Sequence, residues 1–308
     1  MTPDVNQIDP RSFNGLFLDS LKVPGGIEKE AEKTGTFIED RVRENSFLDE
    51  LITPQSIGRL QLDRSVQHDL PMKIGYIEPD AQAVSLNFRG APSEEWIKGP
   101  KYEIVFYKVS TKKMKKTEGE IMAYPYAITQ VIEKNMVKDM ARVKDSTLMG
   151  YVEDIITYME AAGYNSSTTV AADMSRDALV VGLNMLDAYQ LNCGNMLMSK
   201  RDWNIWNATQ ASDVGDNVAE EMTRNGYAST TIMGNNVIVT NKRELVAPGS
   251  IYFFTPQKSF GENYILSETN FQIKKDADLI TMEGWQYCGT GIGNLRGVVK
   301  IILPTWTV

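Results

Sequence analysis

Few residues in this chain have side chains that could perform catalysis or bind a metal. The 308 residues include one histidine, His68, and two cysteines, Cys193 and Cys288. Metal sites and catalytic dyads need several such groups close together in the fold. We therefore interpret His68 as a surface or ribbon residue and the two cysteines as free thiols. The sequence predicts no catalytic residue, no metal site and no cofactor.

A glycine-rich stretch near the C-terminus is a candidate for a nucleotide site. It runs Gly289-Thr290-Gly291-Ile292-Gly293. The dinucleotide-binding pattern is G-x-G-x-x-G, followed by a helix whose N-terminus meets the pyrophosphate. Here the spacing is G-x-G-x-G, and the residues that follow, Arg296 to Ile301, are typical of a strand. We interpret the glycines as a turn.

A short basic run is the other feature that could bind a ligand, and it consists of Lys112, Lys113, Lys115 and Lys116. Nucleic-acid binding depends on neutralising phosphates with Lys and Arg. The whole chain is acidic, with a formal charge of −8, which makes it a poor candidate for general binding of this kind. A solvated connection between strands is the default interpretation, and contact with an acidic partner surface is the alternative.

The charge distribution supports that alternative. Residues 98–118 contain seven lysines and two glutamates, a net charge of +5, whereas residues 1–50 contain six basic and eleven acidic residues, a net charge of −5. We hypothesise that the acidic segment of one subunit lies near the basic segment of another. The candidate inter-subunit contacts are Lys112, Lys113, Lys115 and Lys116, together with Phe13 and Phe17 in the acidic segment.

The first third of the chain lacks the pattern of a compact domain. Prolines and glycines break residues 1–50 into short apolar patches, which predicts an extended arm followed by a short helix. Segments 72–77, 83–88 and 101–109 alternate apolar and polar residues, as half-buried strands of a ribbon do. The N-terminus lacks the features of a signal peptide, and no stretch is long and apolar enough to span a membrane.

Residues 126–162 predict one long helix. Apolar residues recur in this segment at intervals of three and four, which places them in a single stripe. Pro125 precedes the segment and Gly163 follows it, at positions that suit the start and the end of a helix. An unbroken helix would measure about 55 Å. The alternative is a break at Gly150 or at the Ser146-Thr147 pair.

The rest of the sequence predicts a mixed α/β body. Asp173 or Ser175 is positioned to cap a helix, and residues 213–225 show a second capped helical pattern. Gly234-Asn235-Asn236 predicts a hairpin turn between two short strands. Further strands are expected at 251–254, 279–287 and 298–303.

The predicted order of elements is an irregular arm, a ribbon, a long helix and a mixed body. We do not expect this order in a stable monomer, because the arm and the ribbon offer few strongly apolar faces to fold against. Symmetric copies in a homo-oligomer would supply those faces. This order of elements resembles the major capsid proteins of tailed bacteriophages, which share the shell fold first seen in phage HK97. The segment 43–47 is similar to the usual lead-in to the extended loop of that family, and the closing stretch from Trp285 to Ile301 resembles its C-terminal strand return.

The resemblance implies an α+β, HK97-like capsid fold with an N-terminal arm, an extended β-loop, a long spine helix and a mixed α/β axial domain. The implied divisions are the arm at 1–50, a lead-in to the peripheral domain at 51–64, the extended β-loop at 65–118, the peripheral domain with its spine helix at 119–168, the axial domain at 169–262 and the return to the peripheral domain at 263–308.

The function implied by the resemblance is that of a major capsid protein without catalysis. Hexamers and pentamers would form an icosahedral head around double-stranded DNA, contacted non-specifically, in a virion assembled in the host cytoplasm. Portal, scaffolding and decoration proteins are the implied partners, and no membrane is involved. The alternatives are an encapsulin-like nanocompartment shell, another virion structural protein, and a soluble α/β enzyme that binds a small molecule through residues 165–308.

Overall fold

The computed structural model describes most of the chain between residues 46 and 303. The described ranges are 46–65, 67–79, 94, 96, 99–123, 128–171, 174–213, 231–240 and 242–303. Residues 1–45 of the predicted arm, with Phe13 and Phe17, therefore lie outside the described residues, whereas residues 46–50 are described. The predicted strand at 83–88 and nearly all of the helical pattern at 213–225 also lie outside the described residues.

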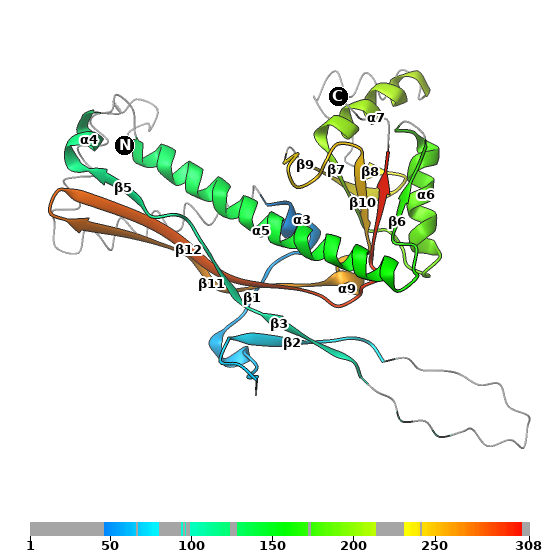
Figure 1. Ribbon diagram of the computed structural model, residues 1–308, viewed down its shortest axis with the longest axis horizontal. Coiled ribbons are helices and arrows are strands. Elements are labelled where there is room, and N and C mark those ends of the chain that lie inside the picture. The colour runs from blue at the N-terminus through cyan, green and yellow to red at the C-terminus, as the bar shows by residue number, and fades with distance from the viewer. Residues whose placement is uncertain are drawn as a thin grey trace, which may run out of the picture.

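One long helix, α5 (Ile128–Ala161), runs along the molecule (Figure 1). Its 34 residues continue without a break through Gly150, so the alternative of two shorter helices is wrong. A Cβ added at Gly150 would meet no atom within 4 Å, because this glycine lies on the open side of the helix. The buried stripe consists of Ile132, Met136, Met140, Leu148, Val152, Ile156 and Met159. After the helix, Gly163 has a φ of +84°, a left-handed conformation that glycine adopts easily.

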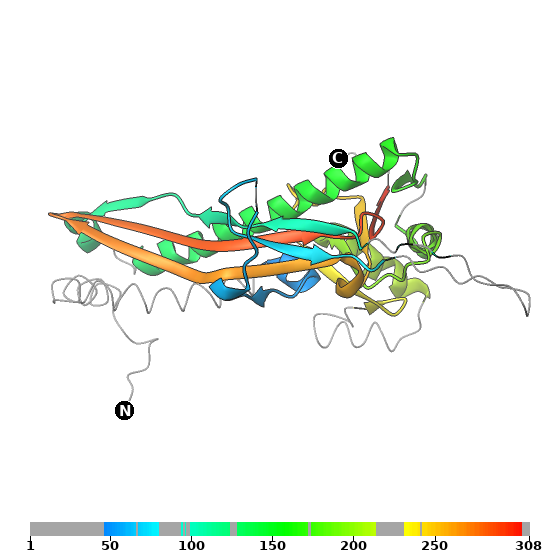
Figure 2. The same cartoon turned by 90° about the horizontal axis from the view of Figure 1, so that it is seen from below.

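A long, narrow sheet lies against the first half of α5 (Figures 1 and 2). Its centre is an antiparallel hairpin of β11 (Gly261–Asp276) and β12 (Leu279–Ile292). On one side β1 (Gln55–Ser56) pairs with β11, and on the other β4 (Tyr107–Ser110) and β5 (Met114–Thr117) pair with β12. The helix α4 (Glu118–Ala123) follows β5. The core between helix and sheet includes Met136, Met140, Phe271, Ile273, Ile280 and Met282.

The second half of α5 packs against a six-stranded sheet. The strand order is β6 (Ser167–Thr169), β13 (Val298–Ile302), β10 (Ser250–Phe254), β7 (Asn195–Ser199), β9 (Asn235–Thr240) and β8 (Thr231–Ile232). All five residues of β10 are buried, as expected for a central strand covered on both faces. One face meets α5 and the short α3 (Phe47–Leu51), and the opposite face meets α6 (Arg176–Asp187) and α7 (Lys200–Asp213).

Two local predictions in this part of the chain are confirmed. The Ser175 hydroxyl accepts a hydrogen bond of 3.3 Å from the backbone N–H of Ala178, so Ser175 caps α6. A hairpin joins β8 and β9, with positive φ at Met233 and Gly234, as a two-residue turn of this kind requires. The turn begins one residue before the predicted one, so Asn235 already belongs to β9.

The predicted β-loop at 65–118 divides into two parts. Among the strands of the described residues, β2 (Met72–Tyr76) and β3 (Lys101–Val105) pair only with each other, and they project from the body as a ribbon (Figure 1). β4 and β5 instead join the five-stranded sheet, because Phe106 and Val109 are buried in its core. The segment 263–308 divides in the same way, since β11 and β12 belong to the five-stranded sheet and β13 belongs to the six-stranded one.

The interpretation of the glycine stretch as a turn is wrong. Gly289 and Gly291 lie inside β12, and the chain turns only after Ile292. A Cβ on Gly291 would lie 2.4 Å from Cγ1 of Ile104, and a Cβ on Gly293 would lie 2.8 Å from Cε1 of Tyr102. The glycines therefore form a flat track, defined here as Gly289, Gly291 and Gly293, on which the root of the ribbon lies. Glycine is needed at these positions because a side chain would clash with the ribbon root, and not because the backbone turns there.

Candidate assembly surfaces and the network behind them

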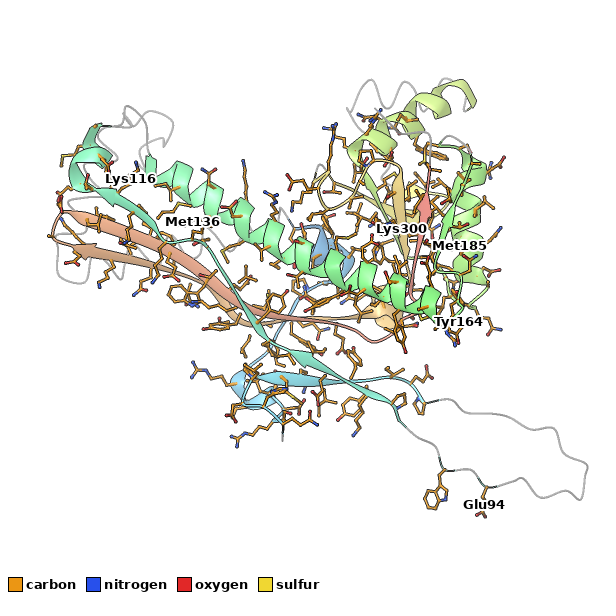
Figure 3. All side chains as sticks on the ribbon, viewed as in Figure 1. Glu94, Lys116, Met136, Tyr164, Met185 and Lys300 are labelled. Carbon is orange, nitrogen blue, oxygen red and sulfur yellow. The ribbon has the colours of Figure 1, made fainter. Side chains whose placement is uncertain are left out.

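The four clustered lysines lie at an edge of the five-stranded sheet rather than on the projecting ribbon (Figure 3 labels Lys116). Lys112 and Lys113 connect β4 to β5, and Lys115 and Lys116 belong to β5. The Nζ of Lys113 lies 3.3 Å from Glu283, and that of Lys116 lies 3.9 Å from Glu120. Lys112, Lys113 and Lys115 are exposed and Lys116 is half-buried, so the patch is accessible to another molecule.

The ribbon and its base expose large apolar side chains. Trp96 is 94% exposed, Tyr76 is 71% exposed and Leu70 is 55% exposed, and Leu60 is fully exposed. A single exposed apolar residue is ordinary on a protein surface, but a group of them on one projection marks an interaction site. The structure therefore offers two candidate assembly surfaces, the lysine patch and the apolar ribbon.

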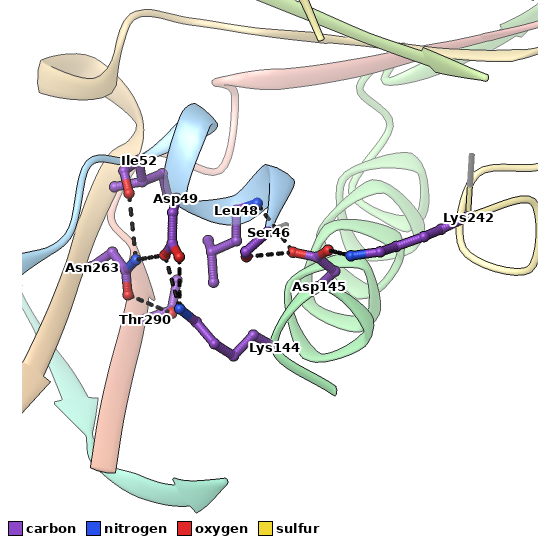
Figure 4. Close-up of polar contacts among 9 residues, drawn as sticks. All are labelled: Ser46, Leu48, Asp49, Ile52, Lys144, Asp145, Lys242, Asn263 and Thr290. Atoms are coloured by element: carbon purple, nitrogen blue, oxygen red, sulfur yellow. Dashed lines mark hydrogen bonds and ion pairs between the residues drawn. The ribbon is translucent and has the colours of Figure 1, made fainter. Parts of the chain in front are cut away.

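A buried ion pair holds the segment before the ribbon against α5 (Figure 4). The Nζ of Lys144 donates to Oδ2 of Asp49 at 2.8 Å, and the two side chains are only 1% and 6% exposed. The amide of Asn263 donates to Asp49 at 3.3 Å, and Thr290 donates to the Asn263 carbonyl at 3.2 Å. Burial raises the pKa of Asp49 above its usual 3.8, and the positive charge of Lys144 opposes that rise.

The next residue of α5, Asp145, binds the same α3 segment and one further segment. Its carboxylate accepts hydrogen bonds from the Ser46 hydroxyl at 2.8 Å and from the backbone N–H of Leu48 at 3.1 Å. It also forms an ion pair with Lys242, which follows β9. Through two adjacent residues, α5 therefore connects to α3, to the β11–β12 hairpin and to the six-stranded sheet.

A second polar contact fixes α5 to the six-stranded sheet. The hydroxyl of Tyr252 on β10 donates to Oε1 of Glu153 at 2.5 Å, and the Nζ of Lys300 on β13 donates to the same oxygen at 2.8 Å. These contacts, with the network around Asp145, fix α5 against α3 and the six-stranded sheet.

This network was not predicted from the sequence, although the sequence contains one signal for it. Buried residues of α5 follow each other at intervals of four at positions 132, 136, 140, 148, 152 and 156. Position 144 continues this series and carries a lysine. A charged residue on a buried stripe has to find a partner in the fold. Its partner could not be identified, because Asp49 is 95 residues away in the chain.

The residues that could have supported catalysis are dispersed. His68 lies at the ribbon base, where its Nδ1 accepts from the backbone N–H of Leu70 at 3.3 Å and its Nε2 lies 3.9 Å from Glu103. Burial raises the pKa of Cys193 to about 12 and also raises that of Cys288. Across the described part of the chain, no three His, Cys, Asp or Glu side chains are grouped to hold a metal ion. None of the helices there is long and apolar enough to span a membrane.

No protein-family model and no curated protein matches the sequence. Solved structures do match. The chain is similar to a virus-like particle from Pyrococcus furiosus, with a TM-score of 0.54 and 12% identity over 88% of this chain and 99% of that one. It is also similar to the capsid of cyanophage P-SCSP1u, with a TM-score of 0.58 and 11% identity over 84% and 88% of the two chains. A third similar structure is the mature capsid of bacteriophage PhiM1. Its TM-score is 0.53, with 8% identity over 86% of this chain and 87% of that one.

These similarities extend over nearly the whole of each chain at very low identity, so they establish the fold. The chain has the fold of capsid shell proteins. More particularly, it has the α+β, HK97-like form of that fold, with its long helix, projecting ribbon and separate six-stranded sheet, and the predicted fold class is confirmed.

Proposed function

We propose that this protein is the major capsid protein of a tailed bacteriophage. Its copies assemble as hexamers and pentamers into an icosahedral head that encloses double-stranded DNA, and the protein has no catalytic role. Portal and scaffolding proteins are its partners during assembly, and a decoration protein is a further partner on the completed head. The net charge of −8 supports this role, since it keeps non-specific attraction to packaged DNA weak.

The observation that carries the proposal is the ribbon of β2 and β3. These two strands pair with no third strand within the described residues. An isolated two-stranded ribbon is at best marginally stable in water. Leu70, Tyr76 and Trp96 remain exposed on the ribbon and its base. Neighbouring copies in a closed shell would cover these side chains and stabilise the ribbon.

The proposed division of the chain follows from this role. The arm at 1–50 and the β-loop at 65–118 contact neighbouring subunits, with 51–64 as the lead-in. Residues 119–168 and 263–308 form most of the peripheral domain, and 169–262 form most of the axial domain. Phe13, Phe17 and the four lysines from Lys112 to Lys116 take part in contacts between subunits.

Electron microscopy and sedimentation of the purified protein test the proposal. Closed polyhedral shells or flat hexameric sheets are the expected products. A compact monomer at every concentration, with a melting temperature that rises on adding a small-molecule ligand, would instead indicate a soluble enzyme and would overturn the proposal.

A nanocompartment shell is the second candidate, because one structural match is a virus-like particle from an archaeon. The two functions differ in the particle contents. Particles isolated from the native source should protect a DNA genome from nuclease if the protein forms a phage head. They should contain protein cargo instead if it forms a nanocompartment.

A further inference from the structure

One side of the helix α6 faces away from the molecule. Its inner side, which includes Leu179, Gly182 and Leu186, packs on the six-stranded sheet. Figure 1 shows α6 on the outside of that sheet. On the outer side of the helix, Val180 and Val181 remain 36% and 37% exposed. Valine is a poor helix former because its branched Cβ loses rotamer freedom in a helix. Two successive exposed valines therefore do not stabilise α6 on its own.

Four outer residues lie in one line along α6. They are Arg176, Val180, Asn184 and Asp187, and all four are exposed. Their separations are four, four and three positions, and such intervals place side chains on the same face of a helix. This spacing is typical of the contact line between two packed helices. The line begins with a cation and ends with a carboxylate.

The two charges at the ends of this line oppose the dipole of their own helix. Arg176 follows the N-cap residue Ser175, at the positive end of the dipole, and Asp187 is the last residue of α6, at the negative end. The two residues are about 16 Å apart along the helix axis, so they cannot pair with each other. Neither forms an ion pair elsewhere in the part of the chain that the structure describes. Within one subunit, both charges are therefore unfavourably placed.

A second copy of α6, packed antiparallel, reverses both relationships. Arg176 of each helix then lies beside Asp187 of the other helix and beside the negative end of the other dipole. Val180 and Asn184 of the two helices meet between the two ion pairs. A parallel copy would instead place like charges side by side. The order of charges along α6 is therefore complementary to α6 itself in the antiparallel direction.

We propose that α6 is a self-association surface, at which two copies of the protein pack their α6 helices antiparallel, with reciprocal Arg176–Asp187 ion pairs around Val180. Such a contact is isologous and closes at two copies. Two helices about 18 Å long bury less area than the roughly 1,200–2,000 Å² of a stable interface, so the dimer is weak by itself. The inference concerns unassembled subunits and does not depend on the proposed shell function.

Charge exchange tests the contact by sedimentation of the unassembled protein. Arg176→Asp and Asp187→Arg are each expected to raise the dissociation constant of the dimer about tenfold, and the double change should return it to within about threefold of the wild type. Each single change also suits the helix dipole better, so the melting temperature should not fall. Lys138→Asp, the same charge change at an exposed position of α5, is the control and should leave the constant unchanged. A wild-type protein that remains monomeric up to about 1 mM, or a double change that restores nothing, would overturn the inference.

Disulfide trapping supplies an independent measurement. Val180→Cys is made in a Cys193→Ser background, because Val180 lies close to the two-fold axis of the dimer, and oxidation should join the subunits into covalent dimers. The matched control is Val143→Cys, at a position on α5 that is 46% exposed, and little covalent dimer is expected from it. No dimer from Val180→Cys, or equal amounts from both variants, would contradict the contact. Shells that form from a protein without this dimer would overturn the inference alone, whereas dimers that never form shells would contradict the proposed function alone.

Discussion

Lys144 and Asp49 form an ion pair in which the Nζ and Oδ2 atoms are 2.8 Å apart, although both side chains are almost completely withdrawn from water. Asp49 lies on α3, with β1 between it and the ribbon in the chain, and Lys144 lies near the middle of α5. The contact therefore fixes α3 against α5. Removing water from two charges is costly, and the pair is tolerated because each charge has its partner.

Asp49→Ala is expected to destabilise the protein by about 3–5 kcal/mol, because it leaves the Lys144 ammonium buried and unpaired. The double change Asp49→Ala with Lys144→Met should recover much of that loss, since it removes both charges. Urea unfolding followed by tryptophan fluorescence measures these differences. Lys113→Ala is the control, because Lys113 is 64% exposed and its partner Glu283 also pairs with Lys108. This control should lower stability by less than about 1 kcal/mol. Equal losses for the two single variants would show that burial of the pair is unimportant.

Gly291→Val is expected to lower stability by about 1–3 kcal/mol, because its Cβ would lie 2.4 Å from Ile104 and would force the root of the ribbon away from β12. Gly150→Ala is the matched control on α5. Nothing lies within 4 Å of its added Cβ, and it should raise stability by about 0.5–1 kcal/mol through helix propensity. Thermal melts of both variants test the assignment. An unchanged melting temperature for Gly291→Val would mean that the glycine track does not determine the position of the ribbon.

Neutralising the lysine patch, by changing Lys112, Lys113, Lys115 and Lys116 to Gln, should weaken assembly more than it weakens the fold. Exposed ion pairs contribute less than about 1 kcal/mol each to folding, whereas the summed charge attracts an acidic partner segment. Sedimentation at increasing salt concentration measures the effect. Wild-type assembly should weaken with salt, because salt screens exposed charges, and the variant should respond less. If assembly of the variant and of the wild type depended on salt in the same way, the lysine patch would not be part of the contacts between subunits.

Alkaline pH should reveal the packing of Tyr102 against the glycine track. Burial, aided by the nearby Glu262 carboxylate, raises the pKa of Tyr102 from 10 to about 12. Between pH 10 and pH 12 the unfolded chain therefore loses this proton while the folded chain keeps it. This difference favours the unfolded state, so stability falls as pH rises through that window. Melting temperatures measured across it should fall less steeply for Tyr102→Phe than for the wild type. The control is Tyr76→Phe, at a position that is 71% exposed, and its melting temperature should fall with pH as steeply as that of the wild type. If the melting temperatures of Tyr76→Phe and Tyr102→Phe fell with pH at the same rate, the packing of Tyr102 would not be the cause.

Several regular elements, although not α7 or β11, were predictable because each depends on neighbours in sequence. The stripe of α5 repeats every three or four residues, and it predicted a helix over 126–162 where the structure has Ile128–Ala161. The alternation in 72–77 and 101–109 predicted strands, and β2 and β3 lie within those segments. The cap at Ser175 is also a contact over three residues. The order of these elements was enough to suggest the shell fold.

Contacts between distant segments were not predictable in this way. The sequence indicates that residues 98–118 are basic, yet only the pairing of β4 and β5 with β12 places Lys112 to Lys116 on the sheet edge instead of the ribbon. The glycine spacing excluded a dinucleotide site, but the purpose of Gly291 became clear only from its contact with Ile104.

By itself, then, the sequence determined α5, α6, most of the strands and the scarcity of catalytic groups, because periodicity, capping and composition act over a few residues. It predicted neither the helix α7 at Lys200–Asp213 nor the long strand β11 at Gly261–Asp276. The tertiary structure alone decided that Lys144 is buried and that alternate glycines in β12 receive the ribbon root. Those outcomes depend on which side chains meet after the chain has folded, and no local pattern records that pairing.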